Sequence, residues 1–220
     1  MKTKSDTHSE SLRHRPLYTL TDVARYARVQ PDTLRSWAGD LFEKDGAEGP
    51  SPFSFVNLVE VHVLMALRRI HRVKMNDIRK AIDWLIKQSG TIHPLAELDL
   101  ETGGKEIFVR FFGVPVSASA GGQAAFPQIV DLYLSRIERD KDRLPTRFYP
   151  FTYDNCPKTI VMDPAVAFGR PVVVGTRVAT TMVFDRYSGG ESLTAIADDY
   201  GLDIQSVEEA LRCEIERRAA

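Results

Sequence analysis

Hydrophobic residues in the first ninety positions recur at the three- and four-residue spacing of amphipathic helices. The stretch 19–38 predicts a helix, a turn and a second helix. Thr19 is expected to cap the first helix, and Asp22, three residues later, completes a capping box. Pro31 suits the first position of the second helix, and Gly39 is expected to end it.

Two longer helices are predicted next, before the spacing of the hydrophobic residues changes. One helix is expected over 55–71 with Ser54 as its cap, and another over 75–88 with Gly90 as its stop. Apolar and polar residues then alternate over 97–116 around a glycine-containing turn. This alternation predicts a β-hairpin.

Helical spacing returns over about 125–139, where we predict another helix. The following stretch, 140–158, is charged at first and then contains prolines and aromatic residues. Such a change of composition between two patterned regions indicates a domain boundary.

The C-terminal part predicts two short strands and three helices. The apolar runs 159–162 and 172–174 are expected to form the strands. Helices are predicted over 179–188, over 193–200, and from about Asp203 to the end. The residues of the last helix expected to point inward are Val207, Ala210, Leu211 and Ile215.

The sequence GRPVVVGTR, residues 169–177, raises the question of a phosphate-binding loop. A P-loop has four residues between its glycines and a lysine after the second, whereas five residues separate Gly169 from Gly175 and no lysine follows. We therefore interpret the glycines as tight turns at either end of a buried strand of three valines. Arg177 has two interpretations, an ion pair within its own domain or a contact with a partner.

Composition excludes several classes of protein. No apolar run approaches the roughly 20 residues that cross a bilayer, and the polar residues 1–16, which lack a signal-peptide core, are expected to be a disordered lead-in. Cys156 and Cys213 lie far apart and outside any CxxC pair, which suits a reducing cytoplasm. We find no hydrolase motif, and we predict a protein that is not an enzyme and needs no cofactor.

Neither the histidines nor the acidic pairs of the sequence indicate a metal site or a catalytic site. The histidines are scattered, without cysteines or carboxylates at metal-ligand spacing, so we interpret them as surface or packing residues. They are His8, His14, His62, His71 and His93. The pairs Asp198-Asp199 and Glu208-Glu209 are expected to be solvated helix faces.

Charge is distributed unevenly behind a net charge of −1. Residues 1–90 carry 15 Lys+Arg and 11 Asp+Glu, whereas residues 163–220 carry 6 and 10. The two helices around Gly201 form a second helix-turn-helix candidate, but its second helix is acidic, so DNA phosphates would repel it. The basic first part is therefore expected to bind nucleic acid, and the acidic last part a different partner.

The helix-turn-helix over 19–38 is the sharpest functional signal. In such a motif the second helix enters the major groove. Arg35 can contact guanine or phosphate, and the hydroxyls of Thr33 and Ser36 can donate to phosphate oxygens. By pattern alone, a helical hairpin inside an interaction domain is the alternative. The predicted DNA-binding residues are Arg25, Arg28, Gln30, Thr33, Arg35 and Ser36.

The first part of the chain resembles the MerR-like regulators. YTLTDVARYARVQPDTLRSWAG, residues 18–39, is similar to the DNA-binding start of that family, and FSFVNLVEVHVLMALRRIHRVKMNDIRKAI, residues 53–82, to its next two helices. The resemblance implies a winged helix-turn-helix that binds operator DNA. The chain then departs from the family, because a predicted hairpin and a short helix replace the long dimerising helix.

The last part resembles the domain-of-unknown-function family 433. The resemblance rests on Asp163-Pro164, Gly169 to Arg177, Gly190, Ser192 to Ala197 and Val207 to Leu211. It implies an antitoxin of a VapBC-like module, paired with a PIN-like ribonuclease toxin whose active site it occludes. The candidate partner-binding residues are Arg177, Arg212, Arg217 and Arg218, which the sequence does not rank, and it leaves open which half of the chain binds the toxin.

Together these patterns predict a mainly α protein with a small β-hairpin. Its expected parts are a lead-in over 1–16, a MerR-like DNA-binding domain over 17–140, a linker over 141–158 and a small antitoxin-type helical domain over 159–220. We expect a cytoplasmic DNA-binding antitoxin that neutralises its toxin and autoregulates its operon, as a homodimer or larger assembly away from membranes. The alternative is a stand-alone MerR-like regulator without a toxin. A nucleic-acid-processing enzyme is disfavoured by the missing acidic triad.

Overall fold

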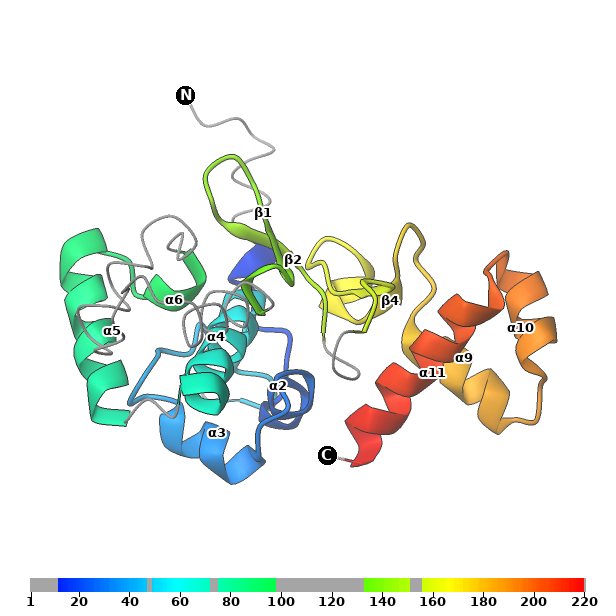
Figure 1. Cartoon of the computed structure of the whole chain (residues 1–220), viewed down its shortest axis with the longest axis horizontal. Coiled ribbons are helices and arrows are strands. Elements are labelled where there is room, and N and C mark those ends of the chain that lie inside the picture. Colours follow the sequence, from blue (N-terminus) through cyan, green and yellow to red (C-terminus); the bar gives the residue numbers. More distant parts are fainter. Residues whose placement is uncertain (1–11, 47–48, 72–74, 98–132, 151–155, 220) are drawn as a thin grey trace, which may run out of the picture. The chain divides into compact units, whose positions relative to one another are not determined.

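The computed structural model of the chain describes residues 12–46, 49–71, 75–97, 133–150 and 156–219 (Figure 1). They fall into two compact units, Arg13–Thr146 and Arg147–Ala220. The described part is mainly helical, as the sequence predicts, and it contains two small two-stranded sheets, of which the sequence predicts the strands of one. Within these ranges, no helix is both long enough and apolar enough to cross a membrane.

The first unit begins with the predicted pair of helices, α2 (Leu20–Tyr26) and α3 (Pro31–Trp37). The capping box is confirmed, since Thr19 Oγ1 accepts the N–H of Asp22 at 3.0 Å while the Asp22 carboxylate accepts the N–H of Thr19 at 3.0 Å. The apolar faces of the two helices are buried, which leaves the opposite face of α3 exposed. The buried residues of these helices are Val23, Ala24, Tyr26, Leu34 and Trp37.

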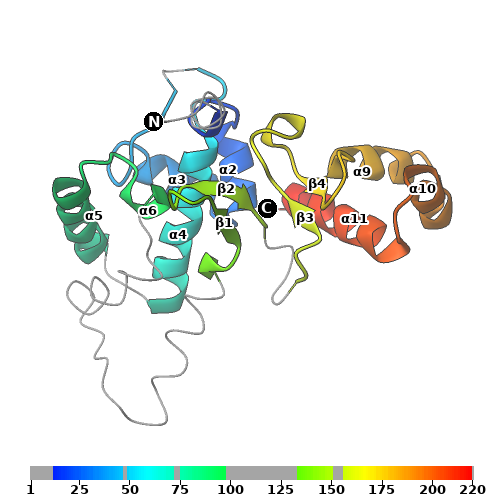
Figure 2. The ribbon, with the colours of Figure 1, turned by 90° about the horizontal axis from the view of Figure 1, so that it is seen from above.

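Helix α4 (Phe55–His71) runs through the middle of this unit (Figures 1 and 2). Ser54 caps it as predicted, because its Oγ accepts the N–H of Asn57 at 3.1 Å. Every side chain from residue 55 to residue 67 is buried, as in a helix that is surrounded on all sides. Three of these buried side chains are polar, namely Asn57, Glu60 and His62.

Helices α5 (Met75–Ser89) and α6 (Pro94–Glu97) follow. Gly90 ends α5 as predicted and has the positive φ of 72° that favours glycine. Helix α6 packs against both α4 and α5, which brings the residue before it, His93, close to α4. The hairpin predicted over 97–116 lies outside the described residues, except that Glu97 ends α6.

A strand replaces the end of the helix predicted over 125–139. The strand β1 (Ile137–Arg139) pairs with β2 (Pro145–Phe148), which lies within the stretch 141–158 predicted as a linker. The carboxylate of Asp140 causes the change of direction, because it accepts two backbone N–H groups of the following turn at 2.9 and 3.0 Å. The hydrophobic spacing alone does not reveal this turn.

The segment 13–16 belongs to the first unit and is not part of a disordered lead-in. The side chain of Arg13 is only 3% exposed, and its guanidinium forms an ion pair with Asp140 at 2.9 Å. His14, next to it, contacts the carboxylates of Asp45 and Glu97. These polar contacts hold the segment in place, and a polar sequence gives no sign of them.

The second unit begins with the predicted short strands. β3 (Ile160–Val161) and β4 (Val172–Val173) are antiparallel, with Ile160 opposite Val173. Gly169 and Gly175, which flank β4, have φ values of 73° and 78°, which confirms the predicted turns. Between the strands lies a short 3₁₀ helix, η1 (Ala167–Gly169). Val174 is 44% exposed, so the buried strand holds two valines rather than three.

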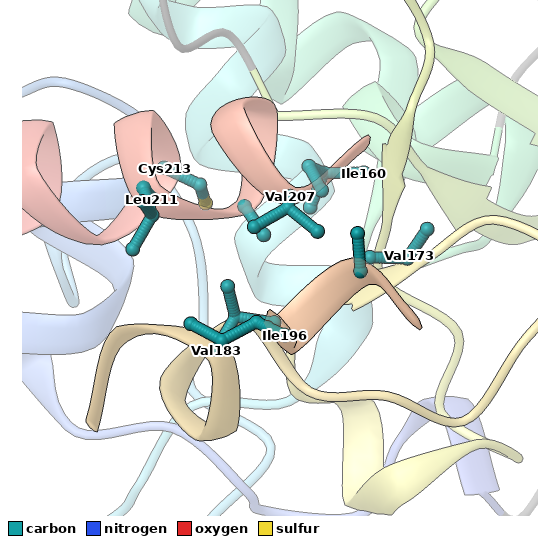
Figure 3. Packing of buried hydrophobic residues seen from close by; sticks show 9 residues of the cluster. Ile160, Val173, Val183, Ile196, Val207, Leu211 and Cys213 are labelled. Carbon is teal, nitrogen blue, oxygen red and sulfur yellow. The ribbon is translucent and has the colours of Figure 1, made fainter. Parts of the chain in front are cut away.

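Helices α9 (Thr180–Ser188), α10 (Leu193–Tyr200) and α11 (Ile204–Ala219) complete this unit, close to their predicted bounds. The N–H of Ala195 donates to the Ser192 side chain before α10, and Gly201 ends this helix in the left-handed conformation. Residues of all three helices and both strands meet in one core (Figure 3). The core residues are Ile160, Val173, Val183, Ile196, Ala197, Val207, Ala210, Leu211 and Cys213.

One predicted inward residue of α11 points outward. Ile215 is 52% exposed, whereas Val207 and Leu211 are buried. Glu214 lies seven residues after Val207 and therefore continues the buried face. Its Oε1 accepts a hydrogen bond from the buried Thr180 hydroxyl of α9 at 2.5 Å. The inward position that hydrophobicity predicts for Ile215 is therefore occupied by Glu214, whose Oε1 this hydrogen bond satisfies.

Candidate functional site

The exposed face of α3 carries the predicted DNA-binding residues of this helix. Gln30, Arg35 and Ser36 are exposed and Thr33 is half-buried, while Leu34 and Trp37 hold the other face in the core. The helix begins at Pro31 without a side-chain cap from Gln30, which leaves the Gln30 amide available for other contacts. The spacing therefore separated the buried and exposed residues of α3 correctly.

An acidic neighbour accompanies the arginine of this face. Arg35 Nη1 and Asp32 Oδ1 form an ion pair one turn apart, and the side chains are 66% and 91% exposed. Ser36 Oγ donates to the carbonyl oxygen of Thr33 at 2.7 Å. A phosphate that approached this face would meet the Asp32 carboxylate as well as the guanidinium, so Asp32 would weaken any contact of this face with a phosphate.

Arg25 and Arg28 lie at the end of α2 and in the turn before α3. Arg28 has a φ of 56°, a conformation that non-glycine residues rarely adopt. Its N–H donates to Arg25 O at 3.1 Å, and Val29 N–H donates to Ala24 O at 2.8 Å. These two bonds form a Schellman motif with arginine in the position that glycine usually occupies.

Arg177, the last residue of the GRPVVVGTR segment, is exposed. Within the described part of the chain it forms no ion pair, so the internal-pair interpretation finds no support there. The preceding Thr176 shapes the loop, since its Oγ1 donates to Val173 O at 2.8 Å and accepts the N–H of Val178 at 3.1 Å. The segment is thus a structural element, a short strand between two turns, with exposed arginines at positions 170 and 177.

The other predicted partner-binding residues lie on α11. Arg212 Nη1 pairs with Glu209 Oε1 at 2.6 Å. Glu209 is only 2% exposed, so the prediction that it lies on a solvated face is wrong. The ion pair with Arg212 compensates for the burial of this carboxylate. Arg217 and Arg218 also belong to α11, but their side chains lie outside the described part.

A cluster of histidines and carboxylates lies within the first unit, where no site was predicted. Three of its members, His14, Asp45 and His93, have ligand atoms within 4.8 Å of one another. His93 Nε2 lies 3.0 Å from Asp45 Oδ1, and His14 Nδ1 lies 3.3 Å from the same oxygen. We call these three residues, with Glu60 and Glu97 around them, the His14–Asp45–His93 cluster.

The second ring nitrogen of each histidine faces another carboxylate of the cluster. His93 Nδ1 lies 2.9 Å from Glu60 Oε2, and both of these side chains are 1% exposed. His14 Nε2 lies 3.4 Å from Glu97 Oε1. Asp45 Oδ2 also accepts a hydrogen bond from the Ser54 hydroxyl. Every ring nitrogen of the cluster is thus oriented by an oxygen.

These contacts change the protonation of the cluster. Hydrogen bonds to Asp45 and then to Glu97 raise the pKa of His14 to about 9. Burial disfavours the charged form of His93, but its contacts with Asp45 and Glu60 outweigh burial and raise the pKa of His93. Burial alone would raise the pKa of Asp45, yet hydrogen bonds from the two imidazoles and Ser54 lower it. Burial raises the pKa of Glu60.

Comparison with known proteins finds relatives that match both units of the chain. The family described as "Protein of unknown function (DUF433)" matches residues 160–212. "Putative antitoxin VapB45" of Mycobacterium tuberculosis is 33% identical over 226 residues, which cover 89% of this chain and 92% of that protein. The chain belongs to the VapB45 family.

Two further relatives support the same grouping. "Uncharacterized protein Rv2308" of Mycobacterium tuberculosis is 24% identical to this VapB45-family chain over 227 residues, with 94% of each covered. The X-ray crystal structure of Rv2018 from Mycobacterium tuberculosis matches with a TM-score of 0.75 and 33% identity, over 90% of this chain and 98% of that one. The VapB45-family chain shares the fold of Rv2018.

Sequence reasoning on this VapB45-family chain found the exposed face of α3 but missed the cluster. His14, Asp45 and His93 are more than thirty residues apart in sequence, so no local spacing joins them. The interpretation of His62 as a packing residue is confirmed: it is buried, and its Nε2 donates to Tyr133 O at 3.0 Å. Burial lowers the pKa of His62 to about 4. The one signal that could have indicated the cluster is Glu60, a carboxylate within a mostly apolar run.

Proposed function

We propose that this chain is a DNA-binding antitoxin that neutralises a PIN-like ribonuclease toxin and represses its own operon, in the cytoplasm and without catalysing a reaction. The carrying observation is the 33% identity to "Putative antitoxin VapB45" over 89% of this chain and 92% of that protein. A match of this extent includes both units. It therefore supports the same two-part organisation in the two proteins, rather than similarity of a single domain.

The proposed DNA contact is the exposed face of α3, as the recognition helix of a MerR-like winged helix-turn-helix. Arg35 and Gln30 lie on this face and can reach base edges, while Thr33 and Ser36 offer hydroxyls to phosphates. Arg25 and Arg28 would add contacts with the backbone. One helix-turn-helix reads one half-site, so operator binding calls for a homodimer or a larger toxin–antitoxin assembly.

The proposed toxin contact is an arginine of the second unit. A nuclease active site rich in carboxylates attracts a guanidinium, which binds them through two parallel hydrogen bonds. Arg177 is exposed and forms no ion pair within the described ranges, whereas Arg212 already pairs with Glu209. We therefore place Arg177 first, with Arg212, Arg217 and Arg218 as further contacts.

Co-expression with the neighbouring genes tests this proposal. An adjacent short reading frame with PIN-like acidic residues should encode a protein that co-purifies with the full chain. Arg177→Ala should weaken the complex roughly 10- to 100-fold, as expected when a buried charge pair loses one partner. Arg170→Ala, an exposed arginine of the same unit, serves as the matched control.

Each outcome of this experiment has a distinct meaning. If Arg177→Ala and Arg170→Ala bind the toxin equally well, the assignment of Arg177 is wrong. If no neighbouring product binds the chain, the antitoxin function is wrong, and a stand-alone MerR-like regulator becomes the better description.

A further inference from the structure

We propose that His14, Asp45 and His93 bind a divalent transition-metal ion, with Zn²⁺ as the ion that the ligands fit best. This inference is independent of the proposed function, because it rests only on side chains within the first unit. The three residues come from different places, His14 from the segment before α2, Asp45 from the loop before α4, and His93 from the turn before α6. A bound ion would join these segments to one another.

The spacing of the ligand atoms suits a zinc ion. Zinc bonds to histidine nitrogen and carboxylate oxygen are about 2.0–2.1 Å long, so neighbouring ligand atoms of a tetrahedral site lie about 3.3 Å apart. Asp45 Oδ1 lies 3.0 Å from His93 Nε2 and 3.3 Å from His14 Nδ1. The third pair, the two imidazole nitrogens, lies within 4.8 Å and needs a small rotation of the half-buried His14 ring.

The surroundings hold the ligands in a metal-binding orientation. A metal-bound histidine almost always directs its other ring nitrogen to a carboxylate, carbonyl or water. Here Glu60 lies 2.9 Å from the second nitrogen of His93, and Glu97 lies 3.4 Å from that of His14. The Ser54 hydroxyl donates to Asp45 Oδ2, the second oxygen of this carboxylate, which itself lies 3.3 Å from His14 Nδ1. Both histidines thus have the outer partner that a metal site requires.

Hydrogen bonds also hold the loop that carries Asp45 in place without a bound ion. The N–H of Asp45 donates to Asn57 Oδ1 at 3.1 Å, and Asn57 Nδ2 donates to the carbonyl oxygen of Glu43 at 2.7 Å. Asn57 is itself buried in α4. A site whose ligands are already positioned loses little conformational entropy when the ion binds.

The charge of the cluster is compatible with a bound divalent cation. Two imidazoles stand among three carboxylates, those of Asp45, Glu60 and Glu97. A divalent ion with two neutral imidazoles supplies the same two positive charges as two protonated rings, so Zn²⁺ would replace one proton on each ring without changing the net charge of the cluster. With three protein ligands, the fourth position of a tetrahedral site would be left to water or a small ligand.

Titration of the full-length protein tests the site. The chain is stripped with EDTA, dialysed, and titrated with Zn²⁺ in a calorimeter without DNA or toxin. We expect saturation at one Zn²⁺ per chain and a higher melting temperature with the ion than without it. Co²⁺ in place of Zn²⁺ should give the visible absorption of a tetrahedral site with nitrogen and oxygen ligands.

Matched variants locate the binding. His14→Gln and Asp45→Asn should each weaken Zn²⁺ binding at least tenfold, and His14 is the safer change because its side chain is 32% exposed. The controls are Asp83→Asn, which removes an exposed carboxylate of α5, and His8→Gln, which removes another N-terminal histidine. Both controls should bind Zn²⁺ as the unchanged chain does.

Two results would overturn the site. One is an unchanged chain that takes up no Zn²⁺ at micromolar concentration or binds it without a defined stoichiometry. The other is a folded His14→Gln variant, verified by circular dichroism, that binds Zn²⁺ as tightly as the controls. Neither result would affect toxin or operator binding, so this failure is distinguishable from a failure of the proposed function.

Discussion

Asp32 lies beside the arginine that we expect to contact DNA, and this pairing determines how the two residues respond to mutation. Arg35→Ala should weaken operator binding roughly 10- to 100-fold, because a guanidinium that contacts guanine or phosphate is lost. Asp32→Asn should strengthen it roughly two- to fivefold, because it removes an exposed ion pair that competes with DNA. A gel-shift titration at fixed salt measures both changes.

The two variants are expected to change operator affinity in opposite directions, which makes the pair decisive. Arg170→Ala, an exposed arginine of the second unit, is the control and should leave operator affinity unchanged. The assignment of α3 fails if Arg35→Ala binds the operator as the control does. It also fails if Asp32→Asn weakens binding, since the carboxylate would then be part of the interface.

Arg28 occupies a left-handed position in the turn between α2 and α3, with a φ of 56°. A residue with a Cβ pays about 1–2 kcal/mol there, and glycine does not, although glycine has more freedom in the unfolded chain. Arg28→Gly should therefore be more stable to urea than Arg28→Ala by about 1 kcal/mol. Both should bind operator DNA less tightly than the unchanged chain. Equal stability of the two variants would show that the turn is not strained.

Individual residues were predictable where a local rule fixes them and unpredictable where distant partners do. The cap at Thr19 and the glycine turns at Gly169 and Gly175 follow from short-range chemistry, and the structure confirms them. The burial of Arg13 depends on Asp140, more than a hundred residues away. No pattern in the sequence joins such a pair.

At the scale of elements, the helices with strong caps lie where the spacing predicts them. Helix α4 begins after Ser54, and α10 lies between Ser192 and Gly201. The prediction failed over 137–139, where Ile137 fits a helix and a strand equally well. The Asp140 side chain favours the strand, because it accepts hydrogen bonds from two backbone N–H groups of the turn that follows.

The core of the second unit gives a test of its helix packing. Ile196 of α10 is fully buried among the three helices, whereas Ile215 of α11 is 52% exposed. Ile196→Val removes one buried methylene and should lower the free energy of unfolding by about 0.5–1.5 kcal/mol. Ile215→Val should change it by less than about 0.5 kcal/mol. Chemical denaturation measures both, and equal effects would contradict the packing of α11.

At the scale of the whole molecule, the net charge differs in sign between the first ninety residues and the last part of the chain. The exposed face of α3 lies within residues 1–90, which carry a net positive charge. Arg177 lies within residues 163–220, which carry a net negative charge. A positive surface attracts DNA, and an acidic one attracts a basic partner while repelling phosphates. Under the proposed function, the two units would therefore bind different partners.

The proposed function came from family resemblance rather than from periodicity. Hydrophobic spacing predicted the helices of both units, but it does not distinguish a DNA-binding motif from a helical hairpin of another kind. The GRPVVVGTR segment carried the resemblance to the domain-of-unknown-function family 433, which implied an antitoxin, and the match over most of the chain to "Putative antitoxin VapB45" supports that expectation. The cluster of His14, Asp45 and His93 could be recognised only from the structure, because the three residues lie far apart in the sequence.

The most direct test of the antitoxin function is a ribonuclease titration. The PIN-like product of the neighbouring gene is purified alone, and its cleavage of RNA is measured while the full-length chain is added. We predict that cleavage stops at a fixed molar ratio of the two proteins, as expected for a tight complex that occludes the active site. Undiminished cleavage at a large excess of the chain would contradict the antitoxin function.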